Sequence, residues 1–114
     1  MFNFFKKTKL EKEVLEAYLG KLPKKIKVAW KREEDGYIVG DIKTNEYEFA
    51  TQGKNGDDFI EMVNDSIFTM YDIKKDHIDV VEKFYKIKPK TKEEYKKLNC
   101  KDVHSSKFEL AFAR

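Results

Sequence analysis

The stretch from Ile26 to Tyr71 constrains the fold more than any other part of this chain. Segments with strand-like patterns come first in it, and a segment with helical periodicity follows. Glycine marks the joints, in Glu34-Asp-Gly-Tyr37 and in Thr51-Gln-Gly-Lys-Asn55. A module of this order is small and shows no catalytic apparatus in its sequence. The question of function therefore becomes what its surface binds.

Alternation of apolar and polar residues is the signal for the strands. Ile26, Val28 and Trp30 share one face while lysines occupy the other, which is typical of a strand with one solvated face. We expect Trp30 to lie in the core. Gly36 predicts a tight hairpin after Asp35, because glycine adopts positive φ without a steric cost. The predicted meander has strands over residues 25–31, 37–42 and 47–51.

The helix that follows the third strand has the strongest local signals. Gly53 ends the strand, and Asn55 or Asp57 can cap the helix. Acidic residues occupy its first turn, where the helix dipole favours negative charge. Its apolar residues form one stripe at helical spacing: Phe59, Ile60, Val63, Ile67, Met70 and Tyr71.

The remaining elements are predicted from capping boxes and periodicity. Thr8 and Glu11 open a helix over residues 9–19, with Gly20 as its stop. Thr91 and Glu94 open a short helix that ends near Leu98. Between them a helical stretch is expected around residues 78–85, and a last strand over residues 107–113.

These elements predict an α+β fold. A three-stranded antiparallel meander and a C-terminal strand, added beside the first strand, pack on the amphipathic helix. We interpret residues 1–24 as an N-terminal helical extension and residues 25–114 as the domain itself.

Composition narrows the functional classes. The net charge of +3 is small for a chain with 39% charged residues, so it does not by itself indicate a nucleic-acid partner. A lone cysteine excludes an internal disulfide and a cysteine-cluster metal site, and we expect a cytoplasmic protein without a cofactor. No apolar run reaches the roughly 18 residues that a membrane span needs. The first seven residues do not have the order of a signal peptide.

The order of elements resembles the HicB family, small antitoxin-type proteins with a partial ribonuclease-H-like fold. Val28-Ala-Trp-Lys-Arg-Glu-Glu-Asp-Gly-Tyr-Ile-Val39 is similar to the family's strand, acidic-Gly-aromatic hairpin and return strand. Phe49-Ala-Thr-Gln-Gly-Lys54 and the helix after it are similar to the next part, and residues 89–112 to the linker and last strand. Asp41–Tyr47 departs from the family's Pro-acidic-Leu-Pro-Gly-Cys-like segment, which indicates a divergent member.

The resemblance implies a protein that is not an enzyme and that binds a small, basic, RNA-cleaving HicA-like toxin, blocking it sterically. Acidic groups on the hairpin and on the helix would then contact the partner: Glu33, Glu34, Asp35, Asp57, Asp58 and Glu61. We also expect a homodimer, because an apolar sheet edge ending in Phe108–Phe112 would otherwise pair without control.

Two other functions stay open at this point. Lysines mixed with aromatic residues suit RNA or single-stranded DNA, although a solvated face is the simpler interpretation. This alternative uses Lys83, Lys86, Lys88, Tyr85 and Tyr95. A metal-dependent nuclease would use carboxylates such as Asp35, Asp41 and Glu48. His77 and His104 have no cysteine or second histidine at ligand spacing, so we expect no metal site and solvated histidines.

Overall fold

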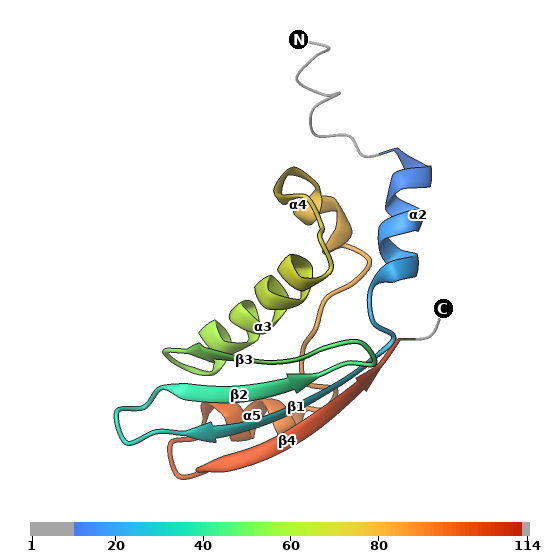
Figure 1. Cartoon of the computed structure of the whole chain (residues 1–114). Helices are drawn as coiled ribbons and strands as arrows, with labels where there is room; N and C mark the ends of the chain where they lie inside the picture. The colour runs from blue at the N-terminus through green and yellow to red at the C-terminus, as the bar shows by residue number, and fades with distance from the viewer. Residues whose placement is uncertain (1–10, 113–114) are drawn as a thin grey trace. The chain divides into compact units, whose positions relative to one another are not determined.

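One antiparallel sheet carries the C-terminal strand beside the first strand. A computed structural model of the protein describes residues 11–112. The order of the four strands in the sheet is β3-β2-β1-β4 (Figure 1). Their bounds are β1 (Lys25–Arg32), β2 (Ile38–Lys43), β3 (Glu48–Gly53) and β4 (Ser105–Ala111). The predicted α+β class and the meander with an added strand are confirmed.

The chain divides into two units, each of which is described by itself. Of the described residues, the larger unit contains residues 23–66 and 87–112, and the smaller one contains residues 11–22 and 67–86. The sheet and α5 (Lys92–Asn99) belong to the larger unit, and α3 (Gly56–Met70) begins there. The smaller unit holds α2 (Lys12–Lys21), the 3-10 turn η1 (Lys75–His77) and α4 (Ile78–Val81). Residues 67–86, which follow most of α3, have most of their contacts within the unit that contains α2.

The first hairpin forms as its Asp-Gly pair predicts. Gly36 has a φ of 93°, a conformation that costs other residues steric strain. The backbone N–H of Glu33 donates to the carbonyl of Tyr37 over 2.8 Å, and the carboxylate of Asp35 accepts the N–H of Tyr37 over 3.0 Å. The turn is therefore closed by local bonds alone.

The core of the larger unit lies on one face of the sheet. Ile26, Val28 and Trp30 are at most 4% exposed, which confirms the alternation in β1. Phe59 of α3 packs against Gly40 of β2 and Gly53 of β3. A Cβ atom at either glycine would collide with Phe59. The glycines let the helix approach the sheet closely. The opposite face of β1 exposes its lysines.

Both helices of the larger unit begin at the predicted caps. The side chain of Asn55 accepts the N–H of Asp58 over 2.9 Å and caps α3. The hydroxyl of Thr91 accepts the N–H of Glu94 over 3.1 Å and caps α5. The third strand was predicted over residues 47–51, whereas β3 begins one residue later and ends two residues later. Tyr47 lies before β3 and is 41% exposed.

The smaller unit departs most from its prediction. The proposed cap at Thr8 lies outside the described residues, and the described N-cap is Glu11, which makes no side-chain capping bond. Gly20 lies inside α2 and does not end it. The helical stretch predicted around residues 78–85 is reduced to α4, which η1 precedes, and Phe84 is 57% exposed. In the described part of the chain, no helix is long and apolar enough to cross a membrane.

Candidate functional site

An open pocket of about 570 Å³ lies at the hairpin end of the larger unit. Residues far apart in the sequence meet there: the β1–β2 hairpin, the turn before α3, the end of α5 and the loop that leads to β4. The lining residues are Arg32, Glu33, Glu34, Asp35, Gly36, Lys54, Asn55, Gly56, Leu98, Asn99, Lys101 and His104.

Arg32 holds the end of α5 against β1. Its guanidinium donates to the carbonyl oxygens of Leu98 at 2.8 Å and of Val103 and Cys100 at 3.0 Å. A longer bond of 3.3 Å reaches the carbonyl of Lys97. The last carbonyls of a helix lack partners within the helix and carry the negative end of its dipole, so a cation there is stabilising. Arg32 therefore has a structural role in the floor of the pocket.

The start of α3 is tied to its surroundings through its acidic residues. The carboxylate of Asp58 accepts the backbone N–H of Lys54 over 2.8 Å. The hydroxyl of Tyr95, on α5, donates to the carboxylate of Asp57. This hydrogen bond, and then the negative charge of Asp57, raise the pKa of Tyr95 above its ordinary value. Gly56 lies so close to Asn99 that a Cβ atom there would collide with the Asn99 side chain.

The structure brings some of the predicted binding residues together at this pocket. Glu33, Glu34 and Asp35 are exposed on the hairpin and line it. The acidic residues of α3 do not line it, but Asp57 directly follows its lining residue Gly56. Since Lys54 and Lys101 also line the pocket, its charge is mixed. Sequence reasoning missed the contribution of residues 98–104, because no local pattern shows which loop faces the hairpin.

The residues of the nucleic-acid alternative are distributed over both units. Lys83 and Lys86 belong to the smaller unit, and Lys88 to the larger. Tyr85 is 2% exposed, and its ring lies 6.4 Å from that of Phe68. A base could stack on Tyr85 only if this ring left its packed position. Tyr95 is 42% exposed, with its hydroxyl bound to Asp57.

The carboxylates of the nuclease alternative lie in different places. Asp35 is in the hairpin, whereas Asp41 and Glu48 face a second hollow of about 550 Å³ over the sheet. Residues 11–112 contain no group of three or more His, Cys, Asp or Glu side chains that could hold a metal ion. His77 lies in the smaller unit, where its Nδ1 is 2.7 Å from the Tyr18 hydroxyl. His104 lines the pocket.

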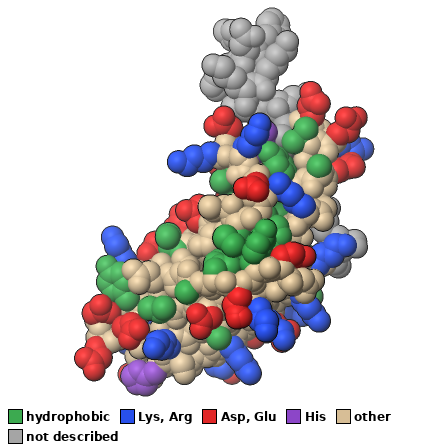
Figure 2. All heavy atoms as spheres, viewed as in Figure 1, with side chains coloured by type: hydrophobic (Ala, Val, Ile, Leu, Met, Phe, Trp, Pro, Cys, Tyr) green, Lys and Arg blue, Asp and Glu red, His purple; other side chains and the backbone are tan. Residues whose placement is uncertain are grey.

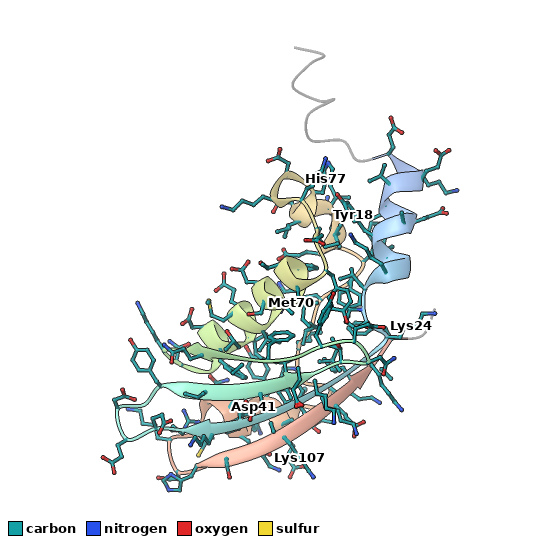
Figure 3. All side chains as sticks on the ribbon, in the orientation of Figure 1. Tyr18, Lys24, Asp41, Met70, His77 and Lys107 are labelled. Atoms are coloured by element: carbon teal, nitrogen blue, oxygen red, sulfur yellow. The ribbon has the colours of Figure 1, made fainter. Side chains whose placement is uncertain are left out.

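The second hollow belongs to the exposed face of the sheet. Lys27, Lys43 and Lys107 line it together with carboxylates on three strands, Asp41, Glu48 and Glu109. Figure 2 shows charges of both signs side by side over the strands, and Figure 3 labels Asp41 on β2 and Lys107 on β4. This face is therefore a mixture of charges, without a field of one sign.

These features define an α+β protein whose larger unit carries an open pocket with an acidic hairpin at its rim. Comparison with known proteins finds no matching family model, no matching curated protein and no matching solved structure.

Proposed function

We propose that this protein is a non-catalytic, HicB-like antitoxin that binds a small basic HicA-like toxin and blocks it sterically. The contact surface is the acidic hairpin together with the first turns of α3. The protein acts in the cytoplasm, where its lone cysteine, Cys100, stays reduced.

The observation that carries this proposal is the position of the acidic hairpin. Glu33, Glu34 and Asp35 are exposed at a turn that Gly36 and the Tyr37 backbone bonds hold in one conformation. They line the rim of the pocket, where Glu33 also lies 4.0 Å from the Lys31 ammonium and Asp35 accepts the Tyr37 N–H. A rigid acidic turn at the rim of a concave surface suits the docking of a basic protein.

The start of α3 also carries acidic residues that suit a basic partner. Asp57 and Glu61 are exposed and Asp58 is half-buried, and the carboxylates of Asp57 and Asp58 accept hydrogen bonds from the Tyr95 hydroxyl and the Lys54 N–H. Opposite charges across an interface mainly accelerate association and suppress wrong partners. Because the charges at the contact surface matter most for these effects, the net charge of +3 on the whole chain does not prevent binding to a basic partner.

The order of the elements supports the family. The meander, the helix after the Thr-Gln-Gly turn and the last strand occur in the order on which the HicB resemblance rests. Residues 41–47 fill the place where the family pattern fails, and they form the end of β2 and the turn into β3.

The test is co-expression with the product of the adjacent reading frame, if that product is a short basic protein. We expect the two proteins to co-purify, and we expect the complex to lose RNA cleavage that the partner shows alone. The charge-reversed variant Glu33→Lys with Glu34→Lys should weaken the complex by about tenfold or more, mostly at low salt where charges are least screened.

The matched control is Asp76→Lys with Asp79→Lys, which reverses two exposed carboxylates of the smaller unit. It should bind like the wild type. Equal weakening by both variants would contradict the assigned surface. Binding of generic RNA that declines steeply with salt, without any protein partner, would favour the nucleic-acid alternative.

A further inference from the structure

The outer side of β4 is an open sheet edge. Residues 11–112 place β1 on one side of β4 and no strand on the other. Flanking backbone bonds show which groups face outward: Phe112 donates to the carbonyl of Lys24 over 2.7 Å, and Arg32 donates to that of His104 over 2.6 Å. Even-numbered residues of β4 therefore bond to β1, and alternate residues must point away from it. The outward set is Ser105, Lys107, Glu109 and Ala111.

We propose that a second copy of this chain pairs with this edge in an antiparallel, two-fold arrangement centred on Phe108. In this register residue 105 faces residue 111 of the second copy, and Lys107 faces its Glu109. Both pairs belong to the outward set, so each can exchange two backbone hydrogen bonds. The two sheets then join into one, and the symmetry closes the assembly at a dimer.

The charges select this register. Lys107 and Glu109 are exposed on the open face, and neither forms an ion pair with residues 11–112. Within its own sheet Lys107 faces Ala29. Centring the pair on Phe108 brings Lys107 against Glu109 of the second copy twice, once on each side of the axis. Cross-strand pairs of opposite charge stabilise a sheet, and like charges directly opposite destabilise it.

Other two-fold registers place like charges opposite each other or pair fewer residues. A centre at residue 107 or 109 places like charges opposite each other. A centre at residue 106 or 110 pairs only residues 105–107 or 109–111 of the strand. A centre at 108 pairs the whole of Ser105–Ala111. It also brings the half-buried Leu110 and Phe112 next to the second copy.

The opposite edge of the sheet lacks this self-complementarity. The bond from Thr44 N–H to the carbonyl of Tyr47 implies that Glu48, Ala50 and Gln52 point outward from β3. A two-fold pair centred on Ala50 would place Glu48 opposite Gln52, without an ion pair. Pairing of β3 with β4 of another copy would build open chains of molecules, since it leaves an edge free at each end.

The test is the mass of the full chain by light scattering and by sedimentation over a concentration series. The wild type should be a dimer at high concentration. Lys107→Glu or Glu109→Lys should each raise the dimer dissociation constant by about tenfold or more, because each places like charges opposite each other twice. The control Lys43→Glu, on the same face but in β2, should leave the constant unchanged.

Restoration of pairing makes the register testable. The double variant Lys107→Glu with Glu109→Lys should dimerise again, and an equimolar mixture of the two single variants should form a heterodimer. Ala111→Pro, which removes an outward N–H group without changing charge, should also weaken the dimer. A monomeric wild type at every concentration, or single variants that dissociate without restoration in the mixture, would overturn the proposal.

Discussion

Asn64 shows at the scale of one residue how a polar side chain organises the core. It is 4% exposed, its amide donates to the carbonyls of Ile60 and Ile87 over 2.9 and 2.8 Å, and its oxygen accepts the Ile87 N–H over 2.7 Å. Asn64→Ala leaves the backbone N–H and C=O groups of the buried Ile87 without their hydrogen-bond partner. We expect a loss of about 2–4 kcal/mol in the free energy of unfolding, because each buried group without a partner costs about 1–3 kcal/mol.

Chemical denaturation followed by tryptophan fluorescence measures this loss, since Trp30 belongs to the same unit. The control is Asp65→Ala, an exposed neighbour on α3, whose effect should stay within about 0.5 kcal/mol. A loss below about 1 kcal/mol for Asn64→Ala would contradict the bridging role.

At the scale of an element, α5 depends on Arg32 at its C-terminal end. Arg32→Lys keeps the charge, but a single ammonium group cannot reach the carbonyls of Leu98, Cys100 and Val103 together. We expect faster hydrogen exchange in residues 97–104 and unchanged exchange in β2 and β3. Lys31→Arg, at the exposed neighbouring position, is the control. Equal exchange in wild type and Arg32→Lys would contradict this role.

At the scale of the whole molecule, we expect alkaline destabilisation from Tyr85. Its burial, and then the nearby charge of Tyr71, raise the pKa of Tyr85 well above the ordinary 10.0. The unfolded chain therefore releases this proton first as the pH rises. Stability is unaffected below about pH 9 and falls above pH 10, by up to about 1.4 kcal/mol per pH unit.

Thermal and urea unfolding followed by circular dichroism at pH 7 to 11 measures this dependence. Tyr85→Phe removes the ionisable group, so the variant should lose less stability between pH 10 and 11 than the wild type. Between pH 7 and 9 the difference between the two proteins should be constant. A parallel decline of both proteins above pH 10 would contradict the assignment.

The sequence predicted the fold more accurately than it predicted which residues lie on the surface. Alternation in Ile26–Trp30, the Asp35-Gly36 turn and the caps at Asn55 and Thr91 are local patterns, and all of them appear in the structure. The helix predicted over residues 9–19 is observed as Lys12–Lys21, because Gly20 does not end it, and its proposed start at Thr8 lies outside the described residues. The interpretation of Tyr85 as part of an accessible stretch did not anticipate its burial, because periodicity does not say which of two neighbouring aromatic residues is covered.

The sequence by itself therefore determined the strands, the turns and the three-stranded meander, because backbone geometry and the separation of apolar from polar residues act over a few neighbouring residues. Only the tertiary structure decided that residues 98–104 meet the acidic hairpin, that Arg32 closes α5, and that Asn64 bridges α3 to Ile87. These contacts join residues far apart in the chain. They depend on which surfaces come together after the elements have formed, and no local pattern records that.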